Sequence, residues 1–309
     1  MGNIDPKYAT QLALERLQRG TAEDLSKFAD TATSIVRMQI RELSVARRVI
    51  APESVTPSEL EREEDSEMLK KIIDIEPDTA AMQMTLRGKA EYKYIEGKKF
   101  AVYMTKFSSN EFAKEVLELM SYTAPLEKII EENTTKDLQT AEDKFFFNGV
   151  KTGIKETGKT FIDSSTTGLT KAGLANTFKL INSNKLRATR MVINAADFDD
   201  VLGWDSTYLG TDLTSKVTVD GYTYEKFMGK DLIITIKSDI VIPGHVYIFT
   251  DSDYLGWSGI LGDVEFQIEK KGGRVSWLTW EYAGYGVKNI NAMARYKLAS
   301  AANDDIIDA

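Results

Sequence analysis

The sequence predicts an α+β fold organised around one long helix. Residues 125–149 carry Pro125 at the first helical position and Gly149 at the end, and these residue types readily start and stop helices. Residues 82–104 and 264–282 instead alternate apolar and polar side chains, as β-strands do. At 1.5 Å per residue the helix would be about 37 Å long. A helix of that length favours a strut that joins separate units.

The predicted helix is apolar at its two ends and polar in its middle. Its apolar positions at helical spacing are Leu126, Ile129, Ile130, Leu138, Ala141 and Phe145. Polar side chains favour water unless they are paired, so we expect the middle of the helix to face solvent. This pattern points to a part of a larger assembly.

Composition excludes several classes of function. The chain has 309 residues, no cysteine and a single histidine, His245. Disulfides, thiolate metal sites and thiol nucleophiles are therefore excluded, and we expect His245 to be a surface residue of a turn. The net charge of −8 argues against a protein that coats nucleic-acid phosphates. We expect no signal peptide and no membrane span, and we predict no catalytic residue, cofactor or metal.

Residues 1–65 are predicted to form an N-terminal arm. Helices are expected at about 6–18 and 21–43, and the second has an apolar face that includes Ile35 and Val36. Two such helices cannot form a core by themselves. The apolar face must therefore pack on the same chain or on a neighbouring copy, and the sequence leaves both arrangements open.

The charge changes sign between the arm and the next segment. Residues 53–67 hold seven acidic residues and one basic residue, whereas residues 86–106 hold six basic and two acidic residues. We predict that residues 66–107 form an extended β-hairpin with its turn at Gly97. Single-stranded nucleic acid is one possible ligand for its tyrosines and lysines. Pairing with the acidic stretch of another subunit explains both charge blocks. The candidate interface residues are Arg87, Lys89, Lys93, Lys98, Lys99, Glu59, Glu61, Glu63, Glu64, Asp65, Ile35 and Val36.

The segments on either side of the long helix are predicted to be a short helix and a loop. Ser108 and Glu111 form a capping box, which predicts a helix through Met120 that buries Phe112. After the long helix, residues 150–168 are rich in glycine and threonine and are expected to form a loop.

A mixed α/β unit is predicted at residues 168–260. We expect helices at 170–183 and 195–202, strands at 190–194, 232–236 and 246–249, and a hairpin around Asp220-Gly221. Residues 261–298 predict further long strands, and residues 299–309 predict a loose acidic tail.

Residues 153–160 match the phosphate-loop pattern G-x-x-x-x-G-K-[ST]. That motif needs a buried strand before the loop and a helix that begins at the lysine, because the helix N-terminus then binds phosphate. Here a long helix precedes the motif, and the sequence after it hardly predicts a helix. A P-loop nucleotide hydrolase therefore stays a remote alternative, which ATP binding by the purified protein would test.

The order of these elements resembles the HK97-fold major capsid proteins of tailed bacteriophages along nearly the whole chain. Two local sequences carry the resemblance. The long helix ends in Glu142-Asp143-Lys-Phe-Phe-Phe-Asn-Gly149, and residues 280–292 read Trp-Glu-Tyr-Ala-Gly-Tyr-Gly-Val-Lys-Asn-Ile-Asn-Ala, which is similar to the closing strands of that family. The implied parts are an N-terminal arm (1–65), an E-loop hairpin (66–107), a peripheral domain (108–167 and 261–298) with a spine helix at 125–149, an axial domain (168–260) and a C-terminal tail (299–309).

The resemblance implies a structural protein and not an enzyme. Copies would assemble as hexamers and pentamers of an icosahedral shell that encloses double-stranded DNA without sequence-specific contacts. Assembly would take place in the host cytoplasm, and portal, scaffolding and, in some members, decoration proteins would be further partners in the virion. The alternative with the same fold is an encapsulin-like nanocompartment shell with protein cargo.

Overall fold

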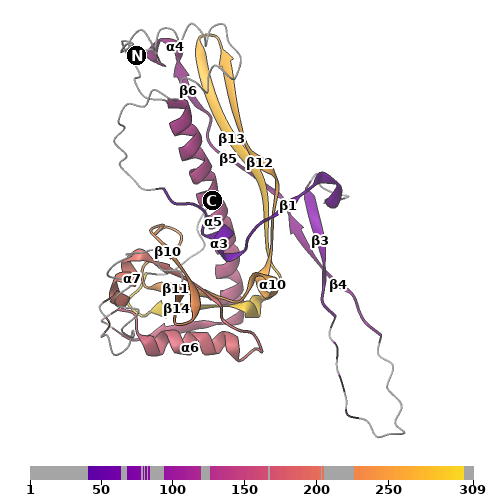
Figure 1. Cartoon of the computed structure of the whole chain (residues 1–309), viewed down its shortest axis with the longest axis vertical. Coiled ribbons are helices and arrows are strands. Elements are labelled where there is room, and N and C mark those ends of the chain that lie inside the picture. The colour runs from indigo at the N-terminus through magenta and orange to yellow at the C-terminus, as the bar shows by residue number, and fades with distance from the viewer. Residues whose placement is uncertain are drawn as a thin grey trace, which may run out of the picture.

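A computed structural model gives the fold of most of the chain (Figure 1). The described residues are 41–63, 68–77, 79, 81, 83, 94–119, 126–165, 168–202, 204 and 226–302. The predicted helix at 6–18, residues 21–40 of the helix predicted at 21–43, the hairpin around Asp220-Gly221, residues 303–309 of the predicted tail, and the candidates Ile35, Val36, Glu64, Asp65, Arg87, Lys89 and Lys93 lie outside these residues. Residues 41–43 of that predicted helix are described and are not helical.

One helix runs along the body of the protein. α5 (Leu126–Thr157) has 32 residues and is therefore about 48 Å long. A ribbon of two long strands, β12 (Gly256–Lys271) and β13 (Arg274–Val287), runs beside one part of α5, and a second sheet lies against its other end (Figure 1). The strut predicted from the sequence is confirmed, and so is the α+β fold class.

The ribbon belongs to a five-stranded sheet in which β1 pairs with β12, and β5 and β6 pair with β13. β12 and β13 are antiparallel from Gly256 opposite Val287 to Lys271 opposite Arg274. The turn between them uses Gly272 and Gly273, which both have positive φ angles. The outer strands are β1 (Glu53–Val55), β5 (Thr105–Ser108) and β6 (Phe112–Glu115).

A six-stranded sheet in the order β7-β14-β11-β8-β10-β9 closes the other end of the molecule. The C-terminal half of α5 covers one face of this sheet, because Phe147, Val150 and Ile154 pack with Tyr247 and Phe249 of β11. Helices α6 and α7 cover the opposite face. The elements are β7 (Thr160–Asp163), α6 (Lys171–Asn182), β8 (Arg190–Asn194), α7 (Ala195–Leu202), β9 (Lys226–Phe227), β10 (Lys230–Thr235), β11 (His245–Phe249) and β14 (Met293–Leu298).

The sequence predicted several of these elements correctly. Strand β8 and helix α7 have the predicted bounds, and α6 begins after Thr170, whose hydroxyl accepts a hydrogen bond from the Gly173 N–H over 3.0 Å. The predicted range 168–260 supplies β8 to β11, while β7 and β14 come from outside it and complete the sheet.

An extended hairpin projects from the body, as predicted, but its strands differ from the prediction. β3 (Leu69–Ile75) pairs with β4 (Lys98–Tyr103), from Lys70 opposite Tyr103 to Ile75 opposite Lys98. Gly97 therefore precedes a strand and is not the turn. The first strand was predicted at 82–94, most of which lies outside the described residues, and the strand that pairs with β4 is β3. β2 (Glu61–Arg62) adds a third strand to this small sheet.

The long helix continues past Gly149, where we expected it to end. Val150 and Ile154 have no exposed surface, so burial on the six-stranded sheet continues the helix beyond this glycine. The helix ends instead next to Gly158, which has the left-handed φ of 65° that favours glycine after a C-terminus. The expected loop at 150–168 therefore begins with two further helical turns.

Two neighbouring segments also differ from their predictions. Residues 112–115 form strand β6 because they pair with β13, and only Val116–Leu119 form a short helix, α4. Phe112 is 42% exposed and is not buried as expected. Residues 160–163, expected as loop, form β7 because they pair in parallel with β14. The remaining short helices are α3 (Ala46–Val49), η1 (Pro57–Glu59), α10 (Ser252–Leu255) and η2 (Ile290–Ala292).

Two glycine substitutions test this packing in opposite directions. A Cβ at Gly256 would lie 2.1 Å from the carbonyl oxygen of Gly286, whereas a Cβ at Gly149 would have no heavy atom within 4 Å. We expect Gly256→Ala to lower the free energy of unfolding by about 1–3 kcal/mol through overpacking. Gly149→Ala should raise it by about 1 kcal/mol through helix propensity. Urea unfolding checks both, and equal effects of the two variants would contradict the packing described here.

Candidate assembly site

Two adjacent carboxylates in α5 hold the segment that enters the body from the arm. Asp143 has no exposed surface and accepts four hydrogen bonds. They come from the Ser44 hydroxyl at 2.7 Å, the Val45 and Ala46 backbone N–H groups at 3.0 and 2.8 Å, and the Lys237 ammonium at 2.7 Å. The carboxylate therefore serves the free N–H groups at the start of α3 and neutralises a buried lysine at the same time.

Glu142 lies beside Asp143 and binds a different set of partners. The Arg47 guanidinium donates to Glu142 through Nε at 2.9 Å and Nη2 at 2.5 Å, a bidentate arrangement that adds geometric specificity. Nη2 also donates to Glu281 of β13 at 2.7 Å. The Tyr285 hydroxyl donates to Glu142 at 2.9 Å. We call Ser44, Arg47, Glu142, Asp143, Lys237, Glu281 and Tyr285 the anchor cluster.

Burial and crowding separate the pKa values of the two glutamates. Burial, together with the nearby Glu142 carboxylate, raises the pKa of Glu281 to about 8. Burial opposes ionisation of Glu142 as well, but the hydrogen bonds from Arg47, Glu281 and Tyr285, together with the positive charge of Arg47, outweigh it and lower the pKa of Glu142. At neutral pH the two carboxyl groups therefore share one proton, which resides on Glu281.

Residues before the cluster extend the attachment. Glu42 accepts hydrogen bonds from the Thr235 hydroxyl at 2.7 Å and the Ile236 N–H at 3.1 Å. The Ser44 N–H donates to the Gln139 side chain at 3.1 Å. At the surface, Arg41 forms a salt bridge of 3.1 Å with Asp137. Segment 41–50 is thus bound to α5 and to the six-stranded sheet together.

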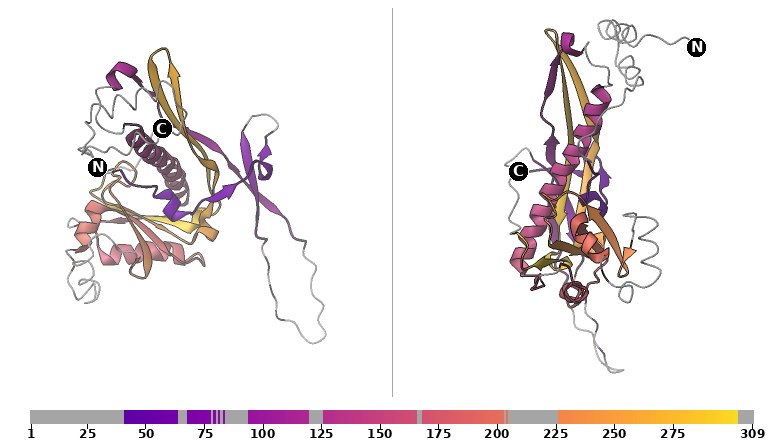
Figure 2. Two further views of the ribbon diagram at one scale, coloured as in Figure 1. Left: turned by 45° about the horizontal axis from the view of Figure 1, so that its top comes forward. Right: turned by 90° about the vertical axis from the view of Figure 1, so that its left-hand side faces the viewer.

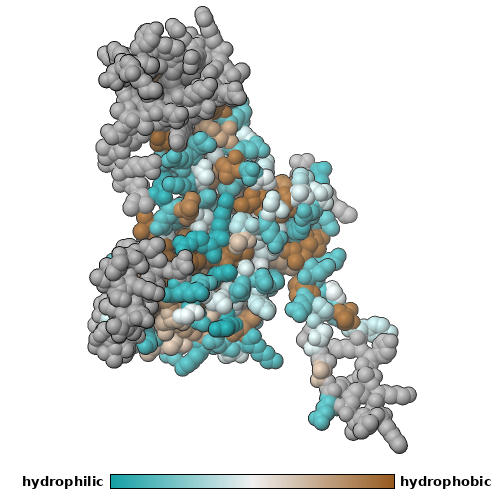
Figure 3. Space-filling model, in the orientation of Figure 1, coloured by the Kyte–Doolittle hydropathy of each residue, from teal (hydrophilic) through white to brown (hydrophobic). Residues whose placement is uncertain are grey.

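The hairpin projects away from the body (Figure 2). Along the hairpin and the residues that lead into it, apolar patches interrupt the hydrophilic surface (Figure 3). The exposed apolar residues there are Met68 (48%), Ile75 (37%), Tyr94 (87%), Ile95 (68%) and Tyr103 (40%). Such a concentration on a projecting element is typical of a surface that another molecule covers.

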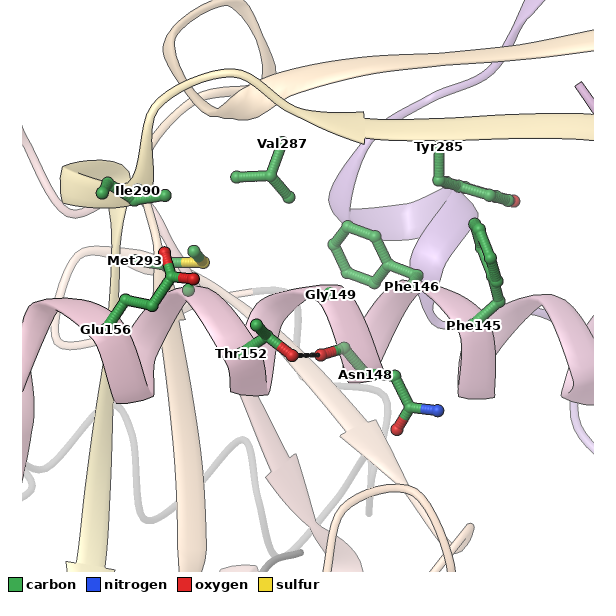
Figure 4. Close-up of a pocket in the computed structure, with 11 residues that line it drawn as sticks. Phe145, Phe146, Asn148, Gly149, Thr152, Glu156, Tyr285, Val287, Ile290 and Met293 are labelled. Atoms are coloured by element: carbon green, nitrogen blue, oxygen red, sulfur yellow. Dashed lines mark hydrogen bonds between the residues drawn. The ribbon is translucent and has the colours of Figure 1, made fainter. Parts of the chain in front are cut away.

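A second apolar surface lies on α5 itself. Between α5 and the connection from β13 to β14 there is a groove of about 520 Å³. Figure 4 shows Phe145 and Phe146 on one side, Val287 and Ile290 on the other, and Gly149 between them on the helix. We call this feature the Gly149 groove.

Comparison with known proteins identifies the architecture. No family model and no curated protein matches the sequence. Solved structures do match. A chain from Gordonia phage Cozz has a TM-score of 0.65 at 14% identity and covers 91% of this chain and 94% of its own. A chain from Microbacterium phage Oxtober96 has a TM-score of 0.62 at 12% identity, with 90% and 99% covered. A chain of the capsid of a native GTA particle has a TM-score of 0.58 at 11% identity, with 87% and 94% covered.

The chain has the HK97-like capsid fold. In the terms of that fold, α5 is the spine helix and the β3–β4 hairpin belongs to the E-loop. The anchor cluster thus joins the arm to the spine helix, and the Gly149 groove lies on the spine helix itself.

The predicted interface residues occupy different surroundings. Lys71 and Lys70 of the same chain form salt bridges with Glu59 and Glu63, the latter at 3.7 Å. The acidic stretch is therefore partly engaged by the base of its own E-loop. Glu61, Lys98 and Lys99 are exposed on β2 and β4. Their pairing with a neighbouring copy stays a prediction.

Sequence reasoning missed the anchor cluster. The polar middle of the helix was expected to face solvent, yet Glu142 and Asp143 are fully buried and paired. The only available signal was their position: both fall one helical turn before Phe146 and Phe147, and so continue the buried stripe. Phe145, which was assigned to the apolar face, is 44% exposed.

The phosphate-loop match and the histidine have structural explanations. Residues 153–157 are helical and residues 160–163 form a strand, the reverse of the order that a phosphate loop requires. Lys159 donates to the Asn291 carbonyl at 3.1 Å. His245 is buried and not a surface residue, and burial, with Arg295 and Lys297 nearby, lowers its pKa to about 4. It is therefore neutral at physiological pH.

Within the described part of the chain, no helix is both long and apolar enough to cross a membrane. The same residues contain no group of three or more histidine or acidic side chains that could hold a metal ion.

Asp143→Ala tests the anchor cluster. The substitution leaves the Lys237 ammonium buried without its partner carboxylate, so we expect the free energy of unfolding to fall by about 3–5 kcal/mol. Asp137→Ala is the matched control on the same helix, because its pair with Arg41 is exposed and should contribute less than about 1 kcal/mol. Urea unfolding compares them, and similar losses for both would show that the anchor cluster does not support the fold.

The shared proton predicts a pH dependence. The pKa of Glu281 is about 8 in the folded chain against an ordinary value of 4.5, so the folded state binds more protons between these values. The free energy of unfolding should therefore fall as the pH rises from about 4.5 to about 8, as far as Glu281 contributes. Glu281→Gln removes this contribution. As the pH rises from about 4.5 to about 8, the free energy of unfolding of the wild type should therefore fall relative to that of the variant. A pH-independent difference would contradict the assignment of the proton.

Proposed function

We propose that the protein is the major capsid protein of a tailed bacteriophage. Its copies assemble as hexamers and pentamers into an icosahedral shell around double-stranded DNA, in the virion, after assembly in the host cytoplasm. The observation that carries the proposal is the match over 87–91% of this chain and 94–99% of chains from phages and from a GTA capsid. At 11–14% sequence identity these matches show the fold, and we infer the function from the fold.

The distribution of surfaces supports this role. The E-loop projects from the body and exposes apolar side chains, among them Tyr94 and Ile95. Interfaces built from such elements can exceed the standard protein–protein size. Portal, scaffolding and decoration proteins would be further partners of the shell, and the protein would act mechanically and not as an enzyme.

The direct test is the state of the purified full-length chain. Sedimentation and negative-stain electron microscopy should show rings or closed shells with fivefold and sixfold units. Nucleic acid inside particles from infected cells would support the phage shell, whereas protein cargo would support a nanocompartment. A chain that stays monomeric at micromolar concentration would contradict both.

The double charge reversal Lys98→Glu/Lys99→Glu tests the E-loop. Both lysines are exposed, so the variant should fold like the wild type, with a thermal midpoint within a few degrees. Shell yield should drop at least tenfold, because the reversal turns an attractive contact into a repulsive one. The matched control reverses Lys171 and Lys179 on α6, which are exposed away from the E-loop. Normal shells from the E-loop variant would refute a charge-dependent E-loop contact.

A further inference from the structure

The single histidine of the chain lies between α5 and the six-stranded sheet. His245 begins β11 and has no exposed surface. Its side chain is on the face that α5 covers, because side chains alternate along a strand and Tyr247 and Phe249 of β11 pack with α5. Neither ring nitrogen has a hydrogen-bond partner within the described part of the chain. Buried polar groups in folded proteins nearly always have such a partner, which points to one outside that part.

Three cationic side chains lie near this histidine. Lys151 of α5 is 4% exposed. Arg295 and Lys297 of β14 are half-buried, and they share the face of Met293, which packs with α5. Burial and these three charges lower the pKa of His245 to about 4, so its ring is neutral at physiological pH. We call Lys151, His245, Arg295 and Lys297 the basic cluster, and its positive charge attracts anions.

An acidic segment of the chain starts close to this cluster. The described residues end at Ala302, and Ala301 lies beside Gly244, the residue before His245, since a Cβ at Gly244 would be 2.6 Å from the Ala301 Cβ. Residues 303–309 contain no basic residue and three carboxylates, those of Asp304, Asp305 and Asp308.

The length of this segment is sufficient to reach the basic cluster. Ala301 packs on the face of the sheet that α6 and α7 cover, so the segment has to pass the end of the sheet. That distance is on the order of 10 Å, the spacing of packed layers, whereas seven extended residues span up to about 23 Å. Charge and reach therefore both favour residues 303–309 as the occupant.

We propose that the acidic segment 303–309 binds the basic cluster of its own chain and so ties the spine helix to β14. Its carboxylates pair with Lys151 on the helix and with Arg295 and Lys297 on the strand, and one of them accepts a hydrogen bond from the ring N–H of His245. The contact lies within one chain, so it goes beyond the proposed shell function and does not depend on it. The segment predicted as a loose tail thereby acquires a structural role.

Acetylation of lysines, followed by mass spectrometry, tests the contact in single subunits and in particles alike. The variants are a chain that ends at Ala302 and the full-length chain with Asp304→Asn, Asp305→Asn and Asp308→Asn. We expect Lys151 and Lys297 to react at least threefold faster in both variants than in the wild type. The exposed Lys185 should react at the wild-type rate. Wild-type rates at Lys151 and Lys297 in the triple variant would overturn the proposal.

A double-mutant cycle tests the pairing of charges. The triple asparagine variant should lower the thermal midpoint by at least about 2 °C in the wild-type background, and by less than half as much when Lys297→Gln is already present. The matched control removes three exposed carboxylates elsewhere, through Asp253→Asn, Asp263→Asn and Glu265→Gln, and its effect should be the same in both backgrounds. Strictly additive losses from the triple variant and Lys297→Gln would refute the contact.

Two further mixtures distinguish other occupants. Inorganic phosphate or double-stranded DNA should leave the acetylation of Lys151 and Lys297 unchanged in the full-length chain, and strong protection by either would assign the basic cluster to phosphates. Full-length chains mixed with truncated ones should not protect these lysines in the truncated chain. Protection there would assign the segment to a neighbouring copy and overturn the proposed contact within one chain.

Discussion

The buried pair Glu142–Asp143 is the constraint on which the rest of the structure depends. Two carboxylates inside a protein are costly unless each has charged or hydrogen-bonding partners. Here the partners come from three other parts of the chain: Arg47 and the start of α3, Lys237 after β10, and Tyr285 of β13. The arm, the axial sheet and the long ribbon therefore meet at one turn of the spine helix. If any of them moved away, a buried charged group would lose its partner.

This arrangement joins the arm segment, the six-stranded sheet and the long ribbon to one helix. The anchor cluster fixes the start of α3 to the spine helix, and Val150 and Ile154 pack the same helix on the six-stranded sheet. Hydrogen-bonded charges thus hold residues 44–47 on the spine helix. The single proton held by Glu281 makes the stability of this junction depend on pH between about 4.5 and about 8. The apolar residues of the E-loop, in contrast, are exposed.

Sequence patterns predicted the fold where local signals and tertiary packing agree. The long helix, the cap at Thr170 and the apolar strands β8 and β11 follow from period and capping alone. Predictions were wrong where pairing with β13 or burial on the six-stranded sheet determines the secondary structure, as at Phe112 and Gly149. Exposed lysines of the E-loop were readable as candidates because charge blocks are visible in sequence. The anchor cluster was not, because Arg47 lies 95 residues from Glu142 and 234 from Glu281, and a polar helix face ordinarily indicates solvent.

Hydrogen exchange at residues 44–50 tests the anchor directly. The N–H groups of Val45 and Ala46 donate to the buried Asp143 carboxylate, so they should exchange as slowly as those of the central strand β11. In Asp143→Asn the same peptide should exchange much faster while β11 stays protected. Exchange of residues 44–50 at the rate of an unfolded peptide in the wild-type protein, with β11 protected, would contradict the account.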